Sequence, residues 1–330
     1  MKFLNRLLIL FIFTALPAIT PTYGQSCAEV FQAEFANKES FVHFSSGREM
    51  NLLVEPAKPD KETFLIIHGL GMDLHSLDGI AQGLQAKGFG TIQMDLHGHG
   101  KTLTKYMEHS RLVPDKIPYE NQVEDLAELI RESNLKNVHI IGHSYGGGIA
   151  IALAKKFSNT SVIKSIHLMA PYLQALDRYY QSFNPAFVYW KWMVGQKGID
   201  FTLDPLTKAN METILTRFYK DRDYPNNASI PLDKLKQLNI QVEAAIAVTM
   251  GIREFNPLKS DLDISRSTSI QLFAAENDQL VPRAMINQFA NKLKADQRSD
   301  EVIAVPGDHF FPLKAGAELV RRILLSEKPH

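Results

Sequence analysis

A short glycine-rich turn in the middle of the chain constrains its fold more than any other feature. The segment Val138–Ala150 reads VHIIGHSYGGGIA, in which an apolar run leads into the pentapeptide Gly142–Gly146 and then into a helix-like pattern. When a strand enters a helix through so tight a turn, only glycine fits two positions either side of the apex. The apex residue, Ser144, is then held in a strained and exposed conformation. The sequence therefore predicts a strand–turn–helix unit that presents a serine hydroxyl as a nucleophile.

Length and composition are those of a globular protein with a sizeable core. The chain has 330 residues, of which 45% are hydrophobic, and that allows one large domain or two smaller ones. The 36 basic residues balance the 36 acidic residues, and no dense lysine or arginine block is present. Neither nucleic acid nor an anionic membrane surface is therefore expected as a partner.

The N-terminus has the pattern of a secretory signal. Lys2 and Arg6 precede the apolar run Leu7–Leu16, which is followed by proline and small or polar residues. The run is too short to span a bilayer comfortably. We expect residues 1–24 to be a signal peptide, cleaved after Gly24, and the mature protein to be exported to the extracellular space or the periplasm. An uncleaved signal that tethers the chain to the membrane is the alternative.

Cys27 is the only cysteine, so no disulfide can form within the chain. Its position just after the signal raises the alternative of a lipoprotein, in which the acylated cysteine becomes the new N-terminus. Residues 24–26 lack the usual aliphatic side chain three positions before the cysteine. The sequence therefore favours an exported chain without a lipid anchor.

Strand-like and helix-like segments alternate along most of the chain. Apolar runs typical of strands lie at 41–44, 49–54, 63–67, 90–94, 138–141, 163–169, 269–275 and 301–305. Helix-like patterns occupy 74–87, 119–132, 147–157, 283–294 and the segment from 314 onward. This alternation predicts an α/β fold with a doubly wound, mostly parallel sheet covered by helices on both faces. We assign the core to residues 25–170 and 267–330.

The segment 171–266 breaks this alternation. It has no clean strand pattern, several helix-like stretches and many aromatic residues. These aromatic side chains are Tyr172, Tyr179, Tyr180, Phe183, Phe187, Tyr189, Trp190 and Trp192. A loop of this length is uncommon in a compact domain, so the segment is predicted to be a helical lid inserted between two strands. The aromatic residues either line a ligand pocket or form the core of the lid itself.

A serine hydroxyl needs a base within hydrogen-bond reach, and the base needs a third group to orient it. His309 follows the last predicted strand, so it emerges at the same edge of the sheet as Ser144. Asp278 lies just beyond the end of the preceding strand and is the best candidate for the orienting acid. The order serine, aspartate, histidine is the one expected for hydrolases built on a doubly wound sheet.

Other acids and histidines fit these roles less well. Glu276 lies too early in its loop, and Asp308 is too close to its neighbour to fold back onto the imidazole. Asp177 and Asp204, both in the predicted lid, are the remaining alternatives for the acid.

Two histidines also invite interpretation as metal ligands. His97 and His99 flank a glycine, but a lone pair of histidines falls short of the three or four ligands of a tetrahedral site. The sequence therefore does not predict a metal site at these histidines.

Acyl transfer also needs an oxyanion hole, in which two backbone N–H groups stabilise the tetrahedral intermediate. The Tyr145 amide, at the start of the helix after the nucleophile, is one expected donor. The Leu70 amide is the other, because Gly69 and Gly71 allow that backbone to approach a substrate closely. His68 is expected to stiffen this loop and to be neither acid nor base.

At these residues the sequence resembles the α/β-hydrolase superfamily, over about residues 40–325. The resemblance is carried by His68–Gly71 as the oxyanion loop, Asp95–Gly100 as a D-x-x-G-x-G loop, Gly142–Gly146 as the nucleophile elbow, and Asp278 and His309 as acid and base. It implies an eight-stranded, mostly parallel sheet, no cofactor, and acyl transfer through a serine ester. The predicted lid does not resemble a particular subfamily.

These observations favour a secreted esterase or lipase-like serine hydrolase that acts on a small-molecule or lipid-like ester with an apolar group. The same residues also suit an amidase, a C–C bond hydrolase or an acyltransferase. A binding protein on a hydrolase scaffold is a third possibility, because a fold does not fix a function. The sequence gives no oligomeric state.

Overall fold

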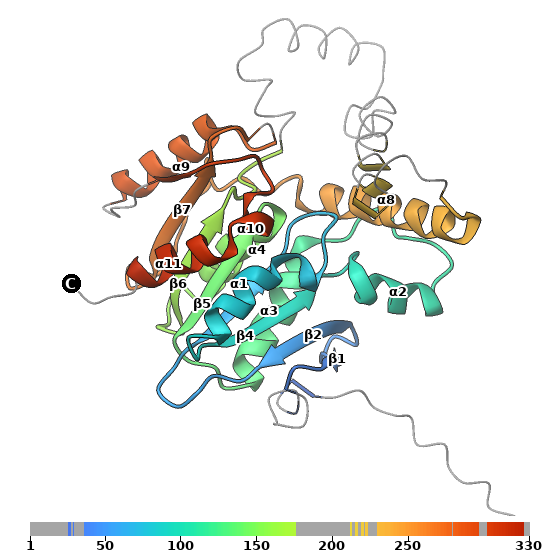
Figure 1. Ribbon diagram of the computed structural model, residues 1–330, viewed down its shortest axis with the longest axis horizontal. Helices are drawn as coiled ribbons and strands as arrows, with labels where there is room; N and C mark the ends of the chain where they lie inside the picture. The colour runs from blue at the N-terminus through green and yellow to red at the C-terminus, as the bar shows by residue number, and fades with distance from the viewer. Residues whose placement is uncertain are drawn as a thin grey trace, which may run out of the picture.

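An eight-stranded sheet runs through the molecule (Figure 1). The computed structural model describes residues 26–27, 29, 36–175, 212, 215–216, 219–220, 222–223, 230–278, 280–296 and 302–326. The strands are β1 (Glu39–His43), β2 (Glu49–Glu55), β3 (Thr63–Ile67), β4 (Gly90–Asp95), β5 (Val138–His143), β6 (Ile163–Met169), β7 (Ser269–Ala275) and β8 (Val302–Val305). Their order is β1-β2-β4-β3-β5-β6-β7-β8, in which β2 pairs antiparallel with β1 and β4 and every other pair is parallel.

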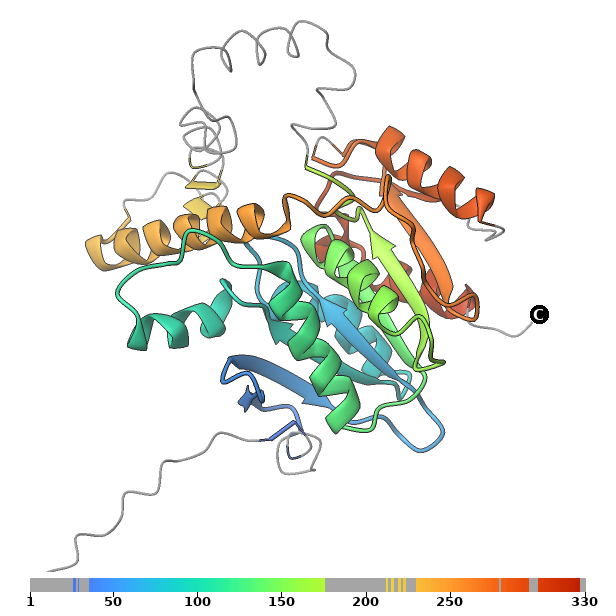
Figure 2. The ribbon, with the colours of Figure 1, turned by 180° about the vertical axis from the view of Figure 1, so that it is seen from behind.

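Helices cover both faces of this sheet. The helices of the described chain are α1 (Asp78–Gln85), α2 (Gly100–His109), α3 (Tyr119–Glu132), α4 (Tyr145–Lys156), α8 (Leu232–Ile252), α9 (Arg283–Ala295), α10 (Phe311–Lys314) and α11 (Gly316–Ser326), with a 3-10 turn, η3, at Leu74–Leu77. Helices α1 and α11 pack together on one face, and α3 and α4 lie on the other, as the view from behind shows (Figure 2). The predicted doubly wound, mostly parallel α/β fold is confirmed.

The central strands are buried on both faces, as expected for parallel strands between two helical layers. Every residue of β4 and β5 is buried. The largest fully buried side chains include Phe64 on β3, Phe273 on β7 and Phe289 on α9. Burying each such side chain contributes about 2 kcal/mol. This core holds the strand ends, and the loops that follow them, in fixed positions.

Two helical elements differ from the sequence prediction. The helix expected over 74–87 is split into η3 and α1, and α2 was not predicted at all. Only Thr102 and Leu103 of α2 are buried, so the helix contributes little to the apolar core. The Asp95 carboxylate accepts a hydrogen bond from the Lys101 amide at 2.8 Å and thereby fixes the first turn of α2.

Part of the predicted lid is described. Helix α8 lies within 171–266, and its Val248 and Ile252 belong to the main apolar core. The amide of Ile117, just before α3, donates to the carbonyl of Ala247 at 3.0 Å. A Cβ at Gly98, in the loop after β4, would come within 2.7 Å of Val248. Helix α8 is therefore packed directly on the loops of the core, whereas the aromatic residues at 179–192 lie outside the described residues.

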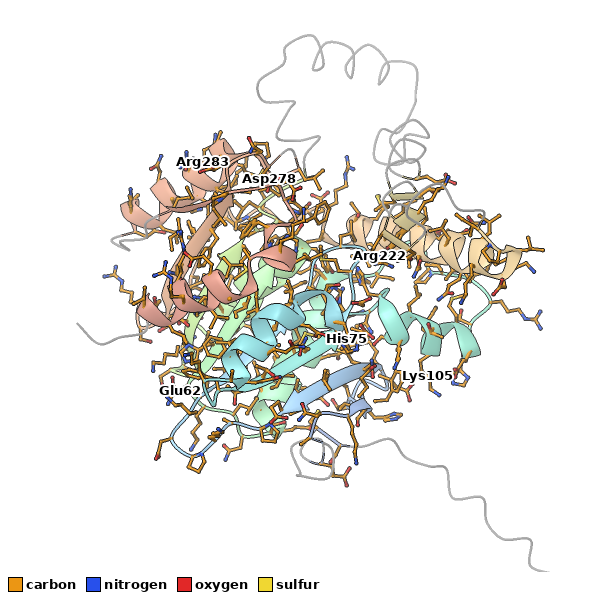
Figure 3. All side chains as sticks on the ribbon, in the orientation of Figure 1. Glu62, His75, Lys105, Arg222, Asp278 and Arg283 are labelled. Carbon is orange, nitrogen blue, oxygen red and sulfur yellow. The ribbon has the colours of Figure 1, made fainter. Side chains whose placement is uncertain are left out.

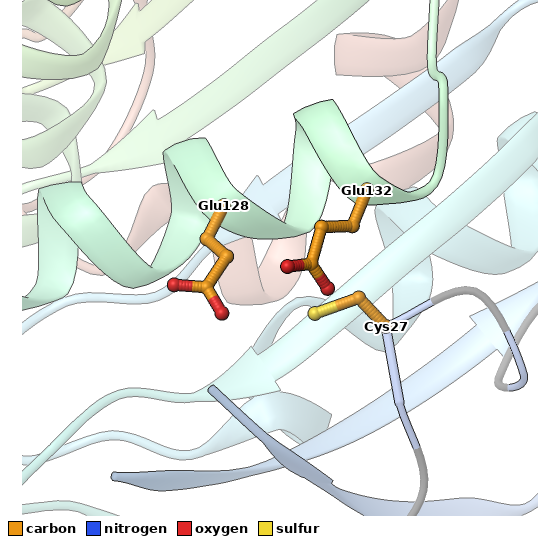
Figure 4. Close-up of side chains that lie close together, drawn as sticks. All are labelled: Cys27, Glu128 and Glu132. Carbon is orange, nitrogen blue, oxygen red and sulfur yellow. The ribbon is translucent and has the colours of Figure 1, made fainter. Parts of the chain in front are cut away.

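The start of the described chain is attached to α3. Cys27 is fully buried beside Glu128 and Glu132 (Figure 4), and its carbonyl accepts a hydrogen bond from the Ser133 hydroxyl at 3.0 Å. The predicted signal peptide, 1–24, lies outside the described residues. In the part of the chain that is described, no helix has both the length and the apolar character needed to cross a membrane.

Candidate active site

The loops that carry the predicted site residues meet at one edge of the sheet. Strands β3, β5, β7 and β8 are parallel, so their carboxyl ends lie at the same edge. Ile67 pairs with Gly142 at the ends of β3 and β5, and Ala275 pairs with Val305 at the ends of β7 and β8. Functional groups of open α/β sheets gather at this edge.

Ser144 is at the apex of a strained turn between β5 and α4. Its φ of 51° and ψ of −116° lie far from the regions that non-glycine residues prefer. Such a conformation costs about 1–3 kcal/mol and persists only where the surroundings enforce it. Among the residues from Val138 to Ile151, Ser144 alone is partly exposed, and all its neighbours there are buried. The turn thus brings a serine side chain to the surface of an otherwise closed core.

Close backbone contacts explain both glycines of this turn. A Cβ at Gly142 would lie 2.5 Å from the Gly146 carbonyl oxygen, and a Cβ at Gly146 would collide with the carbonyls that end β3. Real Cβ atoms do not approach a backbone so closely. Both positions therefore require glycine. The Ser144 amide also donates to the Met169 carbonyl at 2.9 Å, which ties the apex to β6.

The predicted acid and base are in contact. His309 Nδ1 lies 2.8 Å from Asp278 Oδ2, and both side chains are almost completely buried, at 6% and 1% exposure. The other carboxylate oxygen, Oδ1, accepts hydrogen bonds from the amides of Leu280 and Val281, each at 2.8 Å. One oxygen is therefore held by the backbone while the other faces the imidazole, so the carboxylate is fixed in orientation.

This contact determines which nitrogen of His309 can act as a base. An ionised carboxylate only accepts hydrogen bonds, so the proton of a neutral His309 ring is on Nδ1. The unprotonated Nε2 is then available to take a proton from a nucleophile. The loops of acid and base are joined as well, because the Asn277 amide donates to the Gly307 carbonyl at 3.0 Å.

A histidine without a role in the sequence motifs, His143, also contacts the base. His143 Nε2 donates to the backbone carbonyl of His309 at 2.9 Å, and the two rings are 4.9 Å apart. Burial, together with the charge of His309, lowers the pKa of His143 well below its ordinary value. His143 is therefore neutral and does not oppose a positive charge on its neighbour.

The two predicted oxyanion donors flank Ser144. Tyr145 is the first residue of α4, and its amide points along the positive end of that helix. Leu70 belongs to the loop after β3, where a Cβ on the neighbouring Gly69 would lie 3.3 Å from Ser144 Cβ. Within the described part of the chain, neither the Leu70 amide nor the Tyr145 amide donates to an acceptor. Both N–H groups are therefore available to a ligand.

His68 has the structural role expected of it. Its Nε2 accepts a hydrogen bond from the Leu96 amide at 3.2 Å, so its proton is on Nδ1, which donates to the Gly69 carbonyl at 2.8 Å. Burial lowers the pKa of His68, and the ring is fully enclosed. The ring thus bridges the loops after β3 and β4.

The rival acids and histidines have other partners or lie elsewhere. Glu276 is exposed, and Asp308 accepts from the Phe310 amide at 2.9 Å. His97 pairs with the buried Asp125 at 2.7 Å, and His99 Nδ1 lies 3.2 Å from the His97 carbonyl. Asp177 and Asp204 lie outside the described residues.

A cluster with metal-ligating groups lies away from this edge. Among the described residues, Cys27, Glu128 and Glu132 have ligand atoms within 4.8 Å of one another (Figure 4). The last turn of α3 leads into the amino end of β5, so the cluster is at the opposite edge of the sheet from Ser144. Burial and the nearby Glu132 carboxylate raise the pKa of the Cys27 thiol to about 12. The Cys27 thiol is therefore protonated when no ion is bound.

Known proteins share this fold and parts of this sequence. Residues 62–315 match the model of a family described as alpha/beta hydrolase fold. The chain is 33% identical over 102 residues to the magnesium-chelatase 30 kDa subunit of Rhodobacter capsulatus, an alignment that covers 31% of this chain and 33% of that protein. The chain thus spans about a third of the length of a curated relative that it matches.

Solved structures match over most of their length. A thermophilic esterase from Thermogutta terrifontis matches with a TM-score of 0.58 and 18% identity, over 88% of this chain and 97% of that one. A bromoperoxidase from Bacillus anthracis matches with a TM-score of 0.58 and 16% identity, over 87% of this chain and 99% of that one. At such low identity these likenesses show the fold alone.

Proposed function

The chain belongs to the α/β-hydrolase fold family, and we propose that it is a serine hydrolase that cleaves a carboxylic ester carrying an apolar group. The observation that carries the proposal is the hydrogen bond between His309 and Asp278, at the sheet edge where the strained turn exposes Ser144. Fold alone does not identify a reaction, so the proposal rests on these side chains.

In the proposed mechanism, Ser144 Oγ attacks the ester carbonyl while His309 Nε2 takes the hydroxyl proton. Asp278 stabilises the resulting imidazolium, and the Leu70 and Tyr145 amides stabilise the negative charge on the carbonyl oxygen. The intermediate collapses to an acyl-enzyme as His309 gives its proton to the departing alcohol. Water then attacks the acyl-enzyme by the reverse route, which releases the acid and restores the serine.

An apolar substrate group is proposed from the surroundings of Leu70. Its side chain packs against a small apolar cluster formed by Leu215, Tyr219, Leu238, Val242 and Ala245. These buried residues come from the segment predicted to be a lid, so that segment brings apolar side chains next to one proposed oxyanion donor. Pockets for small ligands are lined mainly by such side chains.

The test is hydrolysis of p-nitrophenyl esters of increasing acyl length by a protein that begins at residue 25. Ser144→Ala is measured beside it, and labelling of Ser144 by a fluorophosphonate is followed by peptide mass spectrometry. We expect turnover with a chain-length optimum, and loss of both turnover and labelling in the variant. A Ser144→Ala protein with full esterase activity would refute the proposal. Labelling without ester turnover would redirect it to amides, C–C bonds or acyl transfer.

We also propose that the protein is exported without a lipid anchor. The buried position of Cys27 beside α3 supports this, because acylation would pull the thiol out of the fold. Mass spectrometry of the mature N-terminus, after expression with residues 1–24, tests the proposal. An N-terminus at Gln25 is expected, whereas a diacylglyceryl group on Cys27 would overturn it.

A further inference from the structure

A tight turn presents the proposed oxyanion donor Leu70. The Met72 amide donates to the Gly69 carbonyl at 3.2 Å, which closes a four-residue turn over Gly69–Met72. Gly71, its third residue, has a φ of 72°, as a type II turn requires at that position. We call these four residues the oxyanion turn. Its orientation decides where the Leu70 N–H points.

The core anchors this turn at both ends. The Gly69 carbonyl also accepts from His68 Nδ1, at 2.8 Å. Beyond the turn, the Leu74 amide donates to the buried Asp95 carboxylate at 2.8 Å. Neither anchor holds the peptide that joins Gly71 to Met72, in the middle of the segment.

A residue from the segment predicted to be a lid holds that peptide. Arg222 Nη1 donates to the Gly71 carbonyl oxygen at 2.6 Å, a short, charge-assisted hydrogen bond. Arg222 is 151 residues away from Gly71 in the sequence. In space it lies between α8 and the core (Figure 3). With 33% of its side chain exposed, it is partly shielded from water, so this bond is stronger than a fully exposed one.

Neighbouring residues orient the Arg222 guanidinium toward the oxyanion turn. Asp223 accepts from Arg222 Nε at 2.5 Å and from Nη2 at 2.9 Å, which leaves Nη1 for the Gly71 carbonyl. The guanidinium carbon lies 5.1 Å from the centre of the Tyr219 ring, within range of a cation–π interaction. Tyr219 is itself buried in the apolar cluster that contacts Leu70. The same part of the segment thus contacts the side chain of Leu70 and the carbonyl of Gly71.

We propose that Arg222 is a positioning residue that holds the oxyanion turn in its active orientation. The inference rests on the proposed function, because it assigns Arg222 to the geometry of that same site. Arg222 would touch no reacting atom. It would act through the Gly71 carbonyl, by keeping the Leu70 N–H directed at the developing oxyanion. A loss of orientation weakens transition-state stabilisation more than substrate binding, so kcat falls while KM changes little.

The test compares Arg222→Ala, Arg222→Lys and Arg222→Gln with the wild-type enzyme on a p-nitrophenyl ester. Losing a whole oxyanion donor costs about 10²–10³ in rate, so misdirecting one should cost Arg222→Ala about 10- to 100-fold in kcat. Arg222→Lys keeps a charged donor and should recover part of this loss. Lys220→Ala is the matched control, since it removes a cation from the same segment and should leave kcat unchanged.

A second readout separates positioning from a structural role. The affinity of an alkyl boronic acid, which forms a tetrahedral adduct with the serine, should fall by the same factor as kcat/KM. The affinity of the carboxylate product, which lacks that geometry, should change less than threefold. Thermal unfolding of each variant identifies any protein that does not fold. If Arg222→Ala does not fold, Arg222→Gln, which keeps a neutral donor, is compared with the wild-type enzyme in its place.

The outcomes also distinguish this inference from the proposed function. A wild-type enzyme that neither hydrolyses esters nor labels at Ser144 would remove the proposed function, and this inference with it. An active wild-type enzyme whose folded Arg222 variants keep wild-type kcat and boronate affinity would overturn the inference alone. A fall in kcat without a matching loss of boronate affinity would overturn it too.

Discussion

The ring of His143 is hydrogen-bonded to the backbone of His309: His143 Nε2 donates to the His309 carbonyl at 2.9 Å. The two residues are 166 positions apart, and one precedes the proposed nucleophile while the other is the proposed base. The bond thus connects the nucleophile turn directly to the loop after β8. It holds the base from its backbone side, while Asp278 holds the ring.

Replacing His143 by leucine should therefore slow catalysis without touching a reacting group. The variant has no donor for the His309 carbonyl, and an unsatisfied buried carbonyl costs about 1–3 kcal/mol. Small misplacements of a base lower rates by up to about 10²-fold, so we expect a 10- to 100-fold lower kcat. His143→Gln keeps an N–H donor and should lie between leucine and wild type. Equal kcat for all three folded proteins would show that the contact has no catalytic consequence.

A methyl group on Gly69 should disturb the oxyanion turn. A Cβ there would lie 2.9 Å from His143 Nδ1 and 3.3 Å from Ser144 Cβ, and neither neighbour can move freely. Gly69→Ala should therefore displace Leu70 and lower kcat about 10²- to 10³-fold, with a small change in KM. Gly79→Ala is the control, because its nearest neighbour would be 3.8 Å away and alanine favours a helix. Steady-state kinetics that show similar kcat for both variants would contradict the expectation.

The phenol of Tyr145 should contribute to stability and not to catalysis, because the group of Tyr145 that is proposed to act in catalysis is its backbone amide. Tyr145 Oη accepts from Gln122 Nε2 at 2.5 Å, and Gln122 is fully buried. Tyr145→Phe should keep kcat within about threefold and lower the free energy of unfolding by about 1–2 kcal/mol.

A double variant checks the cause of that loss. Replacing both partners by apolar groups removes the unsatisfied amide, so Tyr145→Phe/Gln122→Leu should regain part of the stability in urea unfolding. A 100-fold drop in kcat for Tyr145→Phe would instead assign the hydroxyl a role in the reaction.

The parts of the fold that the sequence predicted are those encoded locally. Runs such as Thr63–Ile67 and Ile163–Met169 are rich in apolar residues, because parallel strands are largely buried on both faces, and their bounds were predicted to the residue. The contact between Asp278 and His309 was also predictable, since both residues follow neighbouring parallel strands and thus emerge at one edge.

The parts that were missed depend on contacts between distant segments. Helix α2 buries little apolar surface and begins against Asp95, a contact that no periodicity reveals. His143 and Arg222 resemble ordinary polar residues in the sequence, and each bonds to a backbone carbonyl more than 150 positions away. A carbonyl acceptor has no side-chain signature, so such contacts become visible only in three dimensions.

The buried carboxylate of Asp125 should make the core sensitive to acid. It accepts from Arg48 Nε at 2.7 Å and lies 2.7 Å from His97 Nε2, with 1% of its side chain exposed. Burial alone would raise the pKa of Asp125, but the hydrogen bonds with His97 and Arg48 outweigh it and lower the pKa below its ordinary value of 3.8. The ionised form is thus favoured by folding. The stability that the ionised Asp125 carboxylate contributes to the folded protein is present above pH 3.8. It is lost as the pH falls through the lower pKa of the folded state.

Asp125→Asn removes this charge without changing the shape of the side chain, and it leaves the Arg48 guanidinium without a carboxylate partner. Breaking a buried pair in this way costs about 3–5 kcal/mol, so urea unfolding at pH 7 should show a loss near that range. The difference from wild type should narrow as the pH falls below 3.8, because the unfolded wild-type chain then takes up a proton at Asp125 that the folded protein, with its lower pKa, still excludes. Glu108→Gln, which removes the exposed partner of Lys105 (Figure 3), should change stability little at either pH. A contrary result would be a free energy of unfolding of Asp125→Asn that differs from that of wild type by the same amount at pH 7 and at pH 3. That result would mean that the packing of the carboxyl group, and not its charge, stabilises the fold.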